Sequence, residues 1–358
     1  MWPDRRLLKL FGVDHPIVLA PMAGAMDTGL AIAVAEGGGL ASLPMAMLDE
    51  AKLRAQVDTF RAATSRPLNL NFFTHTPPVP NNAREHAWRE SLKPFYVEYG
   101  IDPAAPVPSS ERKPFNDAFC TAVEELRPEV VSFHFGLPEK PLLDRVKAAG
   151  CVVMSSATTV EEARWLEAHG CDVVIAQGTE AGGHRGMFLT NSLAGQPGTM
   201  ALVPQVVDAV KLPVIAAGGI SDARGIVAAL ALGASAVQIG TAFLLAPESK
   251  VLPPHRAALK AARDDGTVVT NVMTGRPARG FVNRVMRERG PISDVAPAFP
   301  LAGGALAPLH AKAQAQGSGD FSAMWAGQAA ALGREMPARE MVARFADDAQ
   351  ALLRRLAG

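Results

Sequence analysis

The sequence predicts an α/β protein, a (β/α)8 TIM barrel that carries a small C-terminal cap domain for the substrate. Two observations lead to this fold class. Eight short apolar runs without strict polar alternation lie within residues 17–239, as expected for parallel strands that are buried on both faces. Helical patterns separate the runs, and a strand–helix–strand order favours right-handed βαβ units.

The apolar runs recur at a regular spacing along much of the chain. Three of them begin at residues 130, 152 and 173, and the last two begin at 214 and 236, which leaves room for one helix between successive strands. The eight predicted strands are Ile17–Ala20, Leu40–Leu43, Leu68–Phe72, Val130–Phe133, Val152–Ser155, Val173–Ala176, Val214–Ala217 and Ala236–Ile239.

The segments between the strands carry signals for helix starts and stops. Asp49 and Asp222 are suited to cap helix N-termini, and Gly150 and Gly170 are suited to end helices. The predicted helices are Asp27–Glu36, Asp49–Arg61, Pro141–Ala149, Thr159–His169 and a helix from Ser221-Asp222 to Leu232.

Two gaps between strands are longer than the rest. Pro77–Pro114 is rich in Pro, Asn and charge, which predicts a long loop with some helix over one end of the barrel. Gly186–Gly198 is rich in Gly, Ser and Asn and predicts a mobile loop. Frequent Pro and Gly after Ala246 predict a cap, so we expect a barrel over 1–246, a cap over 247–323 and a helix over 324–358 that returns to the barrel.

Composition excludes several classes of protein. The 358 residues contain 35 basic and 35 acidic side chains, so no basic surface for nucleic acid or an anionic membrane is expected. Hydrophobic residues make up 48%, which excludes a disordered chain. Gly225–Ala246 is uncharged and long enough to span a bilayer, but its change of pattern favours a buried helix, turn and strand.

Features of the N-terminus and the cysteines predict a cytoplasmic protein. The first residues are charged and contain no continuous apolar stretch, so we expect no signal peptide. Cys120, Cys151 and Cys171 are odd in number and form no C-x-x-C pair. Cys151 and Cys171 lie in apolar runs and are expected to be buried free thiols, with no metal site.

Small and polar residues follow the predicted strands, where active sites of such barrels lie. Gly218-Gly219 follows the seventh strand and Gly240-Thr241 follows the eighth. Glycine lets a ligand approach the backbone, and the N–H groups that open a helix bind phosphate. Together the pairs predict a phosphate site; the alternative is that both pairs only make tight turns.

His184 is the candidate catalytic residue, because it follows two glycines in the polar loop after the sixth strand. His134 also ends a strand, but its phenylalanine neighbours favour a packing role. Glu180 is either an acid–base group or an exposed carboxylate. Arg185 either holds an anionic substrate or is solvated. No G-x-S-x-G, H-E-x-x-H, P-loop or post-strand G-x-G-x-x-G motif is present, which disfavours the corresponding hydrolase, zinc and nucleotide-binding classes.

Five strings, LAPMAGAM, LNLNFF, IAQGTEAGGHRG, PVIAAGGI and AVQIGTAF, together resemble the nitronate monooxygenase family, formerly called 2-nitropropane dioxygenases. The match runs in order from Pro16 to Thr241, with a weaker match at 325–328. The resemblance implies an FMN cofactor and oxidation of alkyl nitronates by O₂ to a carbonyl compound and nitrite. It also suggests His184 as the active-site base or anion-contacting group.

By position, the resemblance implies that residues near the ends of several strands contact FMN. The implied residues are Pro21, Met22, Asn71, Gln177, Gly182, Gly183, Gly219, Gln238, Gly240 and Thr241. The chain departs from the family at Phe299, where members often carry tyrosine. Flavin-dependent enoyl-acyl-carrier-protein reductases and NAD(P)H-dependent quinone reductases share the barrel and are the alternative enzymes. A flavin-binding module without catalysis is the alternative outside the enzymes.

Overall fold

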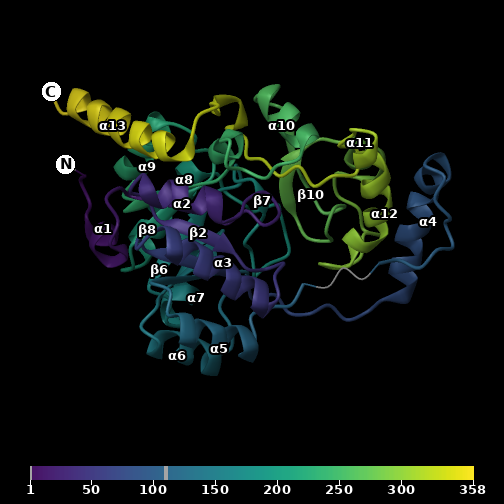
Figure 1. Cartoon of the computed structure of the whole chain (residues 1–358), viewed down its shortest axis with the longest axis horizontal. Helices are drawn as coiled ribbons and strands as arrows, with labels where there is room; N and C mark the ends of the chain where they lie inside the picture. The colour runs from purple at the N-terminus through teal and green to yellow at the C-terminus, as the bar shows by residue number, and fades with distance from the viewer. Residues whose placement is uncertain (1, 109–111) are drawn as a thin grey trace.

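The computed structural model describes residues 2–108 and 112–358, and its centre is a barrel of eight parallel strands (Figure 1). Around the barrel, the order is β1-β2-β3-β4-β5-β6-β8-β9. β9 pairs with β1, and a parallel bridge between Val18 and Leu40 joins β1 to the start of β2. The (β/α)8 TIM-barrel prediction is therefore confirmed.

Each predicted strand forms within a residue or two of its expected bounds. Their residues are almost all buried, because helices cover the outside and side chains fill the inside. The strands are β1 Ile17–Leu19, β2 Ala41–Pro44, β3 Leu68–Phe73, β4 Val130–His134, β5 Val152–Ala157, β6 Val173–Gln177, β8 Val214–Ala217 and β9 Ala236–Ile239.

Four of the helices that surround the barrel begin at predicted helix starts. The side chains of Asp27, Asp49, Thr159 and Asp222 each accept a hydrogen bond from a backbone N–H in the first turn of the helix that follows. The outer helices are α2 Thr28–Glu36, α3 Glu50–Ala63, α5 Asp117–Leu126, α6 Lys140–Ala148, α7 Val160–Ala168, α8 Thr199–Ala209 and α9 Ala223–Ala231, and α1 Arg6–Phe11 precedes the first strand.

The last helix, α13 (Ala338–Leu356), packs against α9 and α2. It therefore lies beside the helices that follow the first strand and precede the last strand of the barrel. Figure 1 shows it in yellow above these two helices. The uncharged stretch 225–246 forms the rest of α9, a turn, β9 and a short 3₁₀ helix, η1 (Thr241–Leu245), as predicted. Among the described residues, no helix is both long and apolar enough to cross a membrane.

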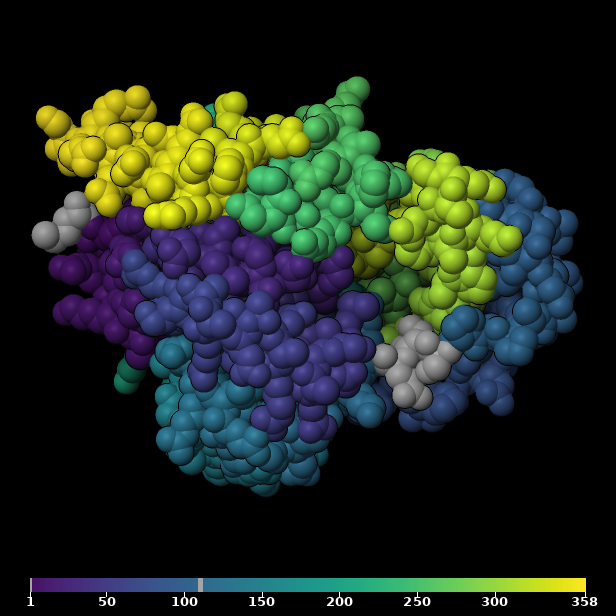
Figure 2. Space-filling model, viewed as in Figure 1, coloured from purple at the N-terminus to yellow at the C-terminus, as the bar shows by residue number. Residues whose placement is uncertain are grey.

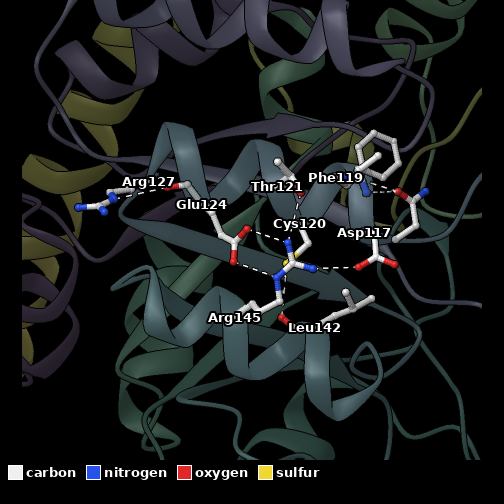
Figure 3. A network of polar contacts seen from close by, with 10 residues as sticks. Asp117, Phe119, Cys120, Thr121, Glu124, Arg127, Leu142 and Arg145 are labelled. Atoms are coloured by element: carbon white, nitrogen blue, oxygen red, sulfur yellow. Dashed lines mark hydrogen bonds and ion pairs between the residues drawn. The ribbon is translucent and has the colours of Figure 1, made fainter.

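Ion pairs tie neighbouring outer helices together at the surface. Figure 3 shows Arg145 on α6 donating to both oxygens of Glu124 on α5, at 2.9 and 2.7 Å, and to Asp117 at 2.8 Å. Nearby, Cys120 lies buried between the two helices. Cys151 and Cys171 are also buried free thiols, and burial raises their pKa to about 11 and about 12, as expected for structural cysteines.

The residues after β9 build a second layer over the barrel. A three-stranded antiparallel sheet joins it to the barrel, because β7 (Gly183–His184), from the loop after β6, pairs with β11. The elements of this cap region are α10 Pro253–Lys260, β10 Thr267–Thr270, β11 Ala278–Phe281, α11 Arg284–Arg289, α12 Ala302–Ala315 and η2 Ala330–Leu332.

The segment 77–114 is more regular than the sequence indicated. It contains α4 (Asn82–Glu98), a 17-residue helix that lies beside α12 in Figure 1. Trp88, Leu92, Phe95 and Tyr96 recur at helical spacing and are buried with α12 in a second core. The Pro, Asn and charged residues here predicted a long loop with some helix, and the helix is confirmed, with an apolar face that packs against the cap.

Candidate active site

The carboxyl ends of the barrel strands meet the cap at one cavity of about 590 Å³, a size typical of sites for small molecules. Figure 2 shows the surface hollowed between the purple barrel residues and yellow-green α12. Every residue implied by the resemblance lines this cavity. They are Pro21, Met22, Asn71, Gln177, Gly182, Gly183, His184, Gly219, Gln238, Gly240 and Thr241.

The turns after β8 and β9 supply backbone at the cavity wall. Gly218 and Gly219 have φ of 111° and 73°, a conformation that only glycine adopts readily. A Cβ on Gly218 would come within 3.0 Å of Ala181 N and Thr199 Oγ1. Within the described part of the chain, the Gly219 N–H donates no hydrogen bond. It is therefore free to donate to a bound group.

Gly240 precedes η1, whose first residue, Thr241, accepts a hydrogen bond from Gly327 N at 2.9 Å. A Cβ on Gly240 would lie 3.1 Å from Ala20 Cβ and 3.3 Å from Met22 Sδ. The turn after β9 thus contacts both the turn after β1 and the cap region. The two glycine turns lie on one cavity wall, as the phosphate-site prediction requires.

Two carboxamides also line the cavity. Asn71, near the end of β3, donates from Nδ2 to Ser132 Oγ at 2.9 Å. Gln238 on β9 has a buried Oε1 without a hydrogen-bond partner among the described residues. An unpaired buried acceptor is costly, so a ligand with a hydrogen-bond donor would be stabilised there.

Gln177 and Gly182 shape the loop that carries the candidate histidine. Gln177 Nε2 donates to His184 O at 3.0 Å, and its Oε1 accepts from Gly186 N at 2.7 Å. The carboxamide therefore fixes the backbone on both sides of Arg185. Gly182 lies against the cap backbone, because a Cβ there would be 2.6 Å from Ala326 C and Gly327 N. Gly183 adopts φ 73° with open space in front of it.

His184 lies in β7, and its ring contacts the cap residue Thr274. Its Nε2 lies 2.9 Å from Thr274 Oγ1, and the Thr274 hydroxyl donates to Arg276 O at 3.4 Å. A hydroxyl has one proton; when Thr274 gives it to Arg276 O, Nε2–H donates to Thr274 and the lone pair lies on Nδ1. Nδ1 has no hydrogen-bond partner within residues 2–108 and 112–358.

The surroundings keep His184 neutral. Burial is the largest cause of a pKa held well below the ordinary value for histidine, followed by the positive charge of Arg112. The rings of Phe299 and Trp325 lie 5.2 and 5.6 Å from the His184 ring. A neutral imidazole with a free lone pair is the form that a general base requires, although the lowered pKa makes this ring a weaker base than an exposed histidine.

His134 has the packing role that its neighbours predicted. Its Nδ1 lies 3.0 Å from Ser156 Oγ and its Nε2 lies 3.1 Å from His184 O, so both ring nitrogens are occupied. Burial lowers its pKa to about 3. It supports the His184 backbone.

Glu180 and Arg185 have structural contacts that neither reading of the sequence anticipated. Glu180 accepts hydrogen bonds from the N–H and hydroxyl of Thr199, at 2.8 to 2.9 Å, and so caps α8. Arg185 is fully buried and donates to Gly178 O and Gln177 O. It is therefore neither solvated nor available to a substrate.

Other cavity residues were not found from the sequence. Thr274 and His310 come from the cap, and Arg112 comes from the end of the long segment after β3, whereas Trp325 belongs to the weaker match at 325–328. Phe115 N donates to Phe73 O at 2.7 Å, which returns this segment to the barrel. No local pattern marks Thr274, His310 or Arg112, because their place depends on contacts between distant elements.

A family model described as nitronate monooxygenase matches residues 4–348. The chain belongs to the nitronate monooxygenase family. The proteins of this family are flavin-dependent oxidoreductases, and the chain is therefore an oxidoreductase enzyme with small-molecule substrates. The resemblance seen in the strand-end strings is confirmed over the whole chain.

Individual relatives support this family membership. The nitronate monooxygenase of Pseudomonas aeruginosa is 43% identical, over 96% of this chain and 98% of its own. That of Paraburkholderia phytofirmans is 41% identical, over 95% and 94%. Among solved structures, nitroalkane oxidase from Streptomyces ansochromogenes superposes with a TM-score of 0.88 at 37% identity, over 98% of this chain and 99% of that one. FabK from Thermotoga maritima gives 0.76 at 28% identity, over 100% and 99%.

Proposed function

We propose that this enzyme binds FMN and oxidises alkyl nitronates with O₂ to a carbonyl compound and nitrite. The observation that carries the proposal is the single cavity at the strand ends, which brings the two glycine turns, the buried Gln238 Oε1 and His184 together. A stoichiometry of two nitronates for each O₂ balances atoms and charge. The oxidant is O₂ itself, so no nicotinamide is required.

The cavity residues fit FMN. The unpartnered Gln238 Oε1 calls for a donor, and the free Gly219 N–H is suited to an acceptor such as a phosphate oxygen. We propose that the cofactor contacts Pro21, Met22, Asn71, Gln177, Gly182, Gly183, Gly219, Gln238, Gly240 and Thr241. Bound FMN would supply the redox chemistry.

The protein residues would supply position and proton handling. A nitronate is already an anion and needs no base before oxidation, whereas a neutral nitroalkane must first lose its α-proton. His184 Nδ1 is the atom proposed to take that proton. Thr274 holds the ring through Nε2, and the aromatic side chains of Phe299 and Trp325 limit water around it.

The alternative enzyme from the sequence resemblance, an FMN-dependent NAD(P)H reductase, is the second candidate. Anaerobic spectroscopy of the purified holoenzyme separates the two. We expect a nitronate to bleach the flavin without NADH, and to yield nitrite and a carbonyl compound in air. Fast bleaching by NADH alone would favour the reductase, and no bleaching by either would favour a flavin-binding module. Mass spectrometry of the released flavin should give FMN; FAD or no flavin would refute the cofactor assignment.

A further inference from the structure

The cavity wall is almost free of charge. No Asp, Glu or Lys is among the described residues that line it, and Arg112 is its single arginine. Four histidines also line it: His134, His184, His255 and His310. Burial lowers the pKa of each of the four, so they are neutral at pH 7. Arg112 is therefore the one described side chain that brings a full charge to the cavity.

Arg112 is directed toward the part of the cavity that contains His184. Its guanidinium carbon lies 5.7 Å from the centre of the Phe299 ring, and that ring lies 5.2 Å from the His184 ring. Arg112 also makes the largest contribution from a charged group to the lowered pKa of His184. The guanidinium and the candidate base thus flank the same aromatic side chain.

Two neighbouring arginines donate to backbone carbonyls, whereas Arg112 has no carboxylate partner in the part of the chain that the structure describes. Arg185 donates to backbone carbonyls, and Arg276 lies 3.8 Å over the Phe135 ring and donates to Met187 O. Within the described residues, Arg112 makes no ion pair with a carboxylate. Burial lowers its pKa, yet the guanidinium stays protonated near pH 7. A partly buried, unpaired cation is costly until an anion reaches it.

We propose that Arg112 binds the two nitro oxygens of the substrate and so selects the anionic nitronate over the neutral nitroalkane. A nitronate presents two oxygens in a plane, as a carboxylate does, and a guanidinium donates to such a pair in parallel. This assignment rests on the proposed function, because it names how that site recognises its substrate.

The test uses the holoenzyme and two readouts, nitrate binding by calorimetry and steady-state kinetics. Nitrate is a planar oxyanion that serves as a probe without turnover. Arg112→Met and Arg112→Gln should weaken nitrate binding and raise KM for a nitronate by on the order of 10- to 100-fold. kcat/KM for the neutral nitroalkane should fall less, because this substrate carries no charge when it binds, so the preference for the nitronate should shrink. Arg112→Lys should recover part of the loss, because it keeps the charge but not the planar fork.

Lys113→Met is the matched control, since it removes an equal charge from the next, exposed residue. Nitrate affinity and nitronate KM should stay at the wild-type values in this variant. If either neutral Arg112 variant kept the wild-type affinity for nitrate and the wild-type nitronate KM, Arg112 would not be the anion site. Failure of the proposed function looks different: the wild-type enzyme would not oxidise nitronates at all, whereas nitrate binding would still report on Arg112.

Discussion

The two walls of the cavity differ in chemistry. The barrel wall presents backbone N–H groups and carboxamides, from residues such as Gly219 and Gln238, in turns directly after strands. The cap wall presents Thr274, Leu306 and Trp325, which are mostly apolar and come from separate elements. The difference indicates a division of roles: the barrel wall fits a cofactor with a phosphate, and the cap wall shapes the space for substrate and holds the ring of His184.

The largest effect is expected at His184, where the two walls meet. His184→Asn should lower kcat/KM for a neutral nitroalkane by about 10²–10⁴-fold, because general-base help is lost. The nitronate should lose less, since it needs no deprotonation, and FMN should stay bound. Kinetics on both substrate forms, with flavin content checked, measures this. His169→Asn, at an exposed histidine on α7's end, is the control. If the His184→Asn enzyme were as active as the wild type on both substrate forms, His184 would not be catalytic and its role would be structural.

An intermediate effect is expected on the barrel wall. Gly219→Val should weaken FMN binding by about 10- to 100-fold, because the side chain would displace the phosphate from its donors. The left-handed backbone adds a folding cost of about 1–2 kcal/mol. Gly12→Val controls for that cost, since Gly12 has φ 72°, open space around its Cβ position and no place in the cavity.

Fluorescence titration with FMN and thermal melts of the apo proteins separate these two contributions. Both variants should melt at lower temperature than the wild type, but only Gly219→Val should bind FMN more weakly. Equal FMN affinity in Gly219→Val and wild type would remove this turn from the cofactor site and leave the two walls without the proposed difference.

The smallest effect is expected on the cap wall. Thr274→Val keeps the side-chain shape but removes the hydrogen bond to His184 Nε2, a bond that typically contributes about 0.5–1.5 kcal/mol. We expect kcat for a neutral nitroalkane to fall about 2- to 10-fold, with little change in KM. Thr274→Ser should restore it, because the hydroxyl returns. Wild-type kcat in the valine variant would show that the cap does not orient the base.

Much of the barrel was predictable because the signals are local. Strands buried on both faces are continuous apolar runs, and caps such as Asp49 and Asp222 act within three residues of themselves. The glycine turns after β8 and β9 were found for the same reason. Strand ends of a parallel barrel must converge, so strand order alone indicated that Asn71, His184 and Gly219 would share one cavity.

The roles of the polar residues around that cavity could not be obtained in the same way. Glu180 and Arg185 lie in the same loop as His184. Glu180 caps α8, whereas Arg185 is buried and donates to backbone carbonyls at the end of β6. Which of the three faces the cavity depends on the pairing of β7 with β11, a contact between segments far apart in the chain.

Periodic burial and short-range hydrogen bonds are properties of neighbouring residues, and they sufficed for the eight strands, five of the helices between them and the position of the glycine turns. They did not indicate α5 or α8. The protonation state of His184 and the single charge of the cavity are different in kind. They arise from burial by the cap, from Thr274 and from Arg112. Only packing between distant segments sets burial and electrostatic distance, so these properties appear with the tertiary structure.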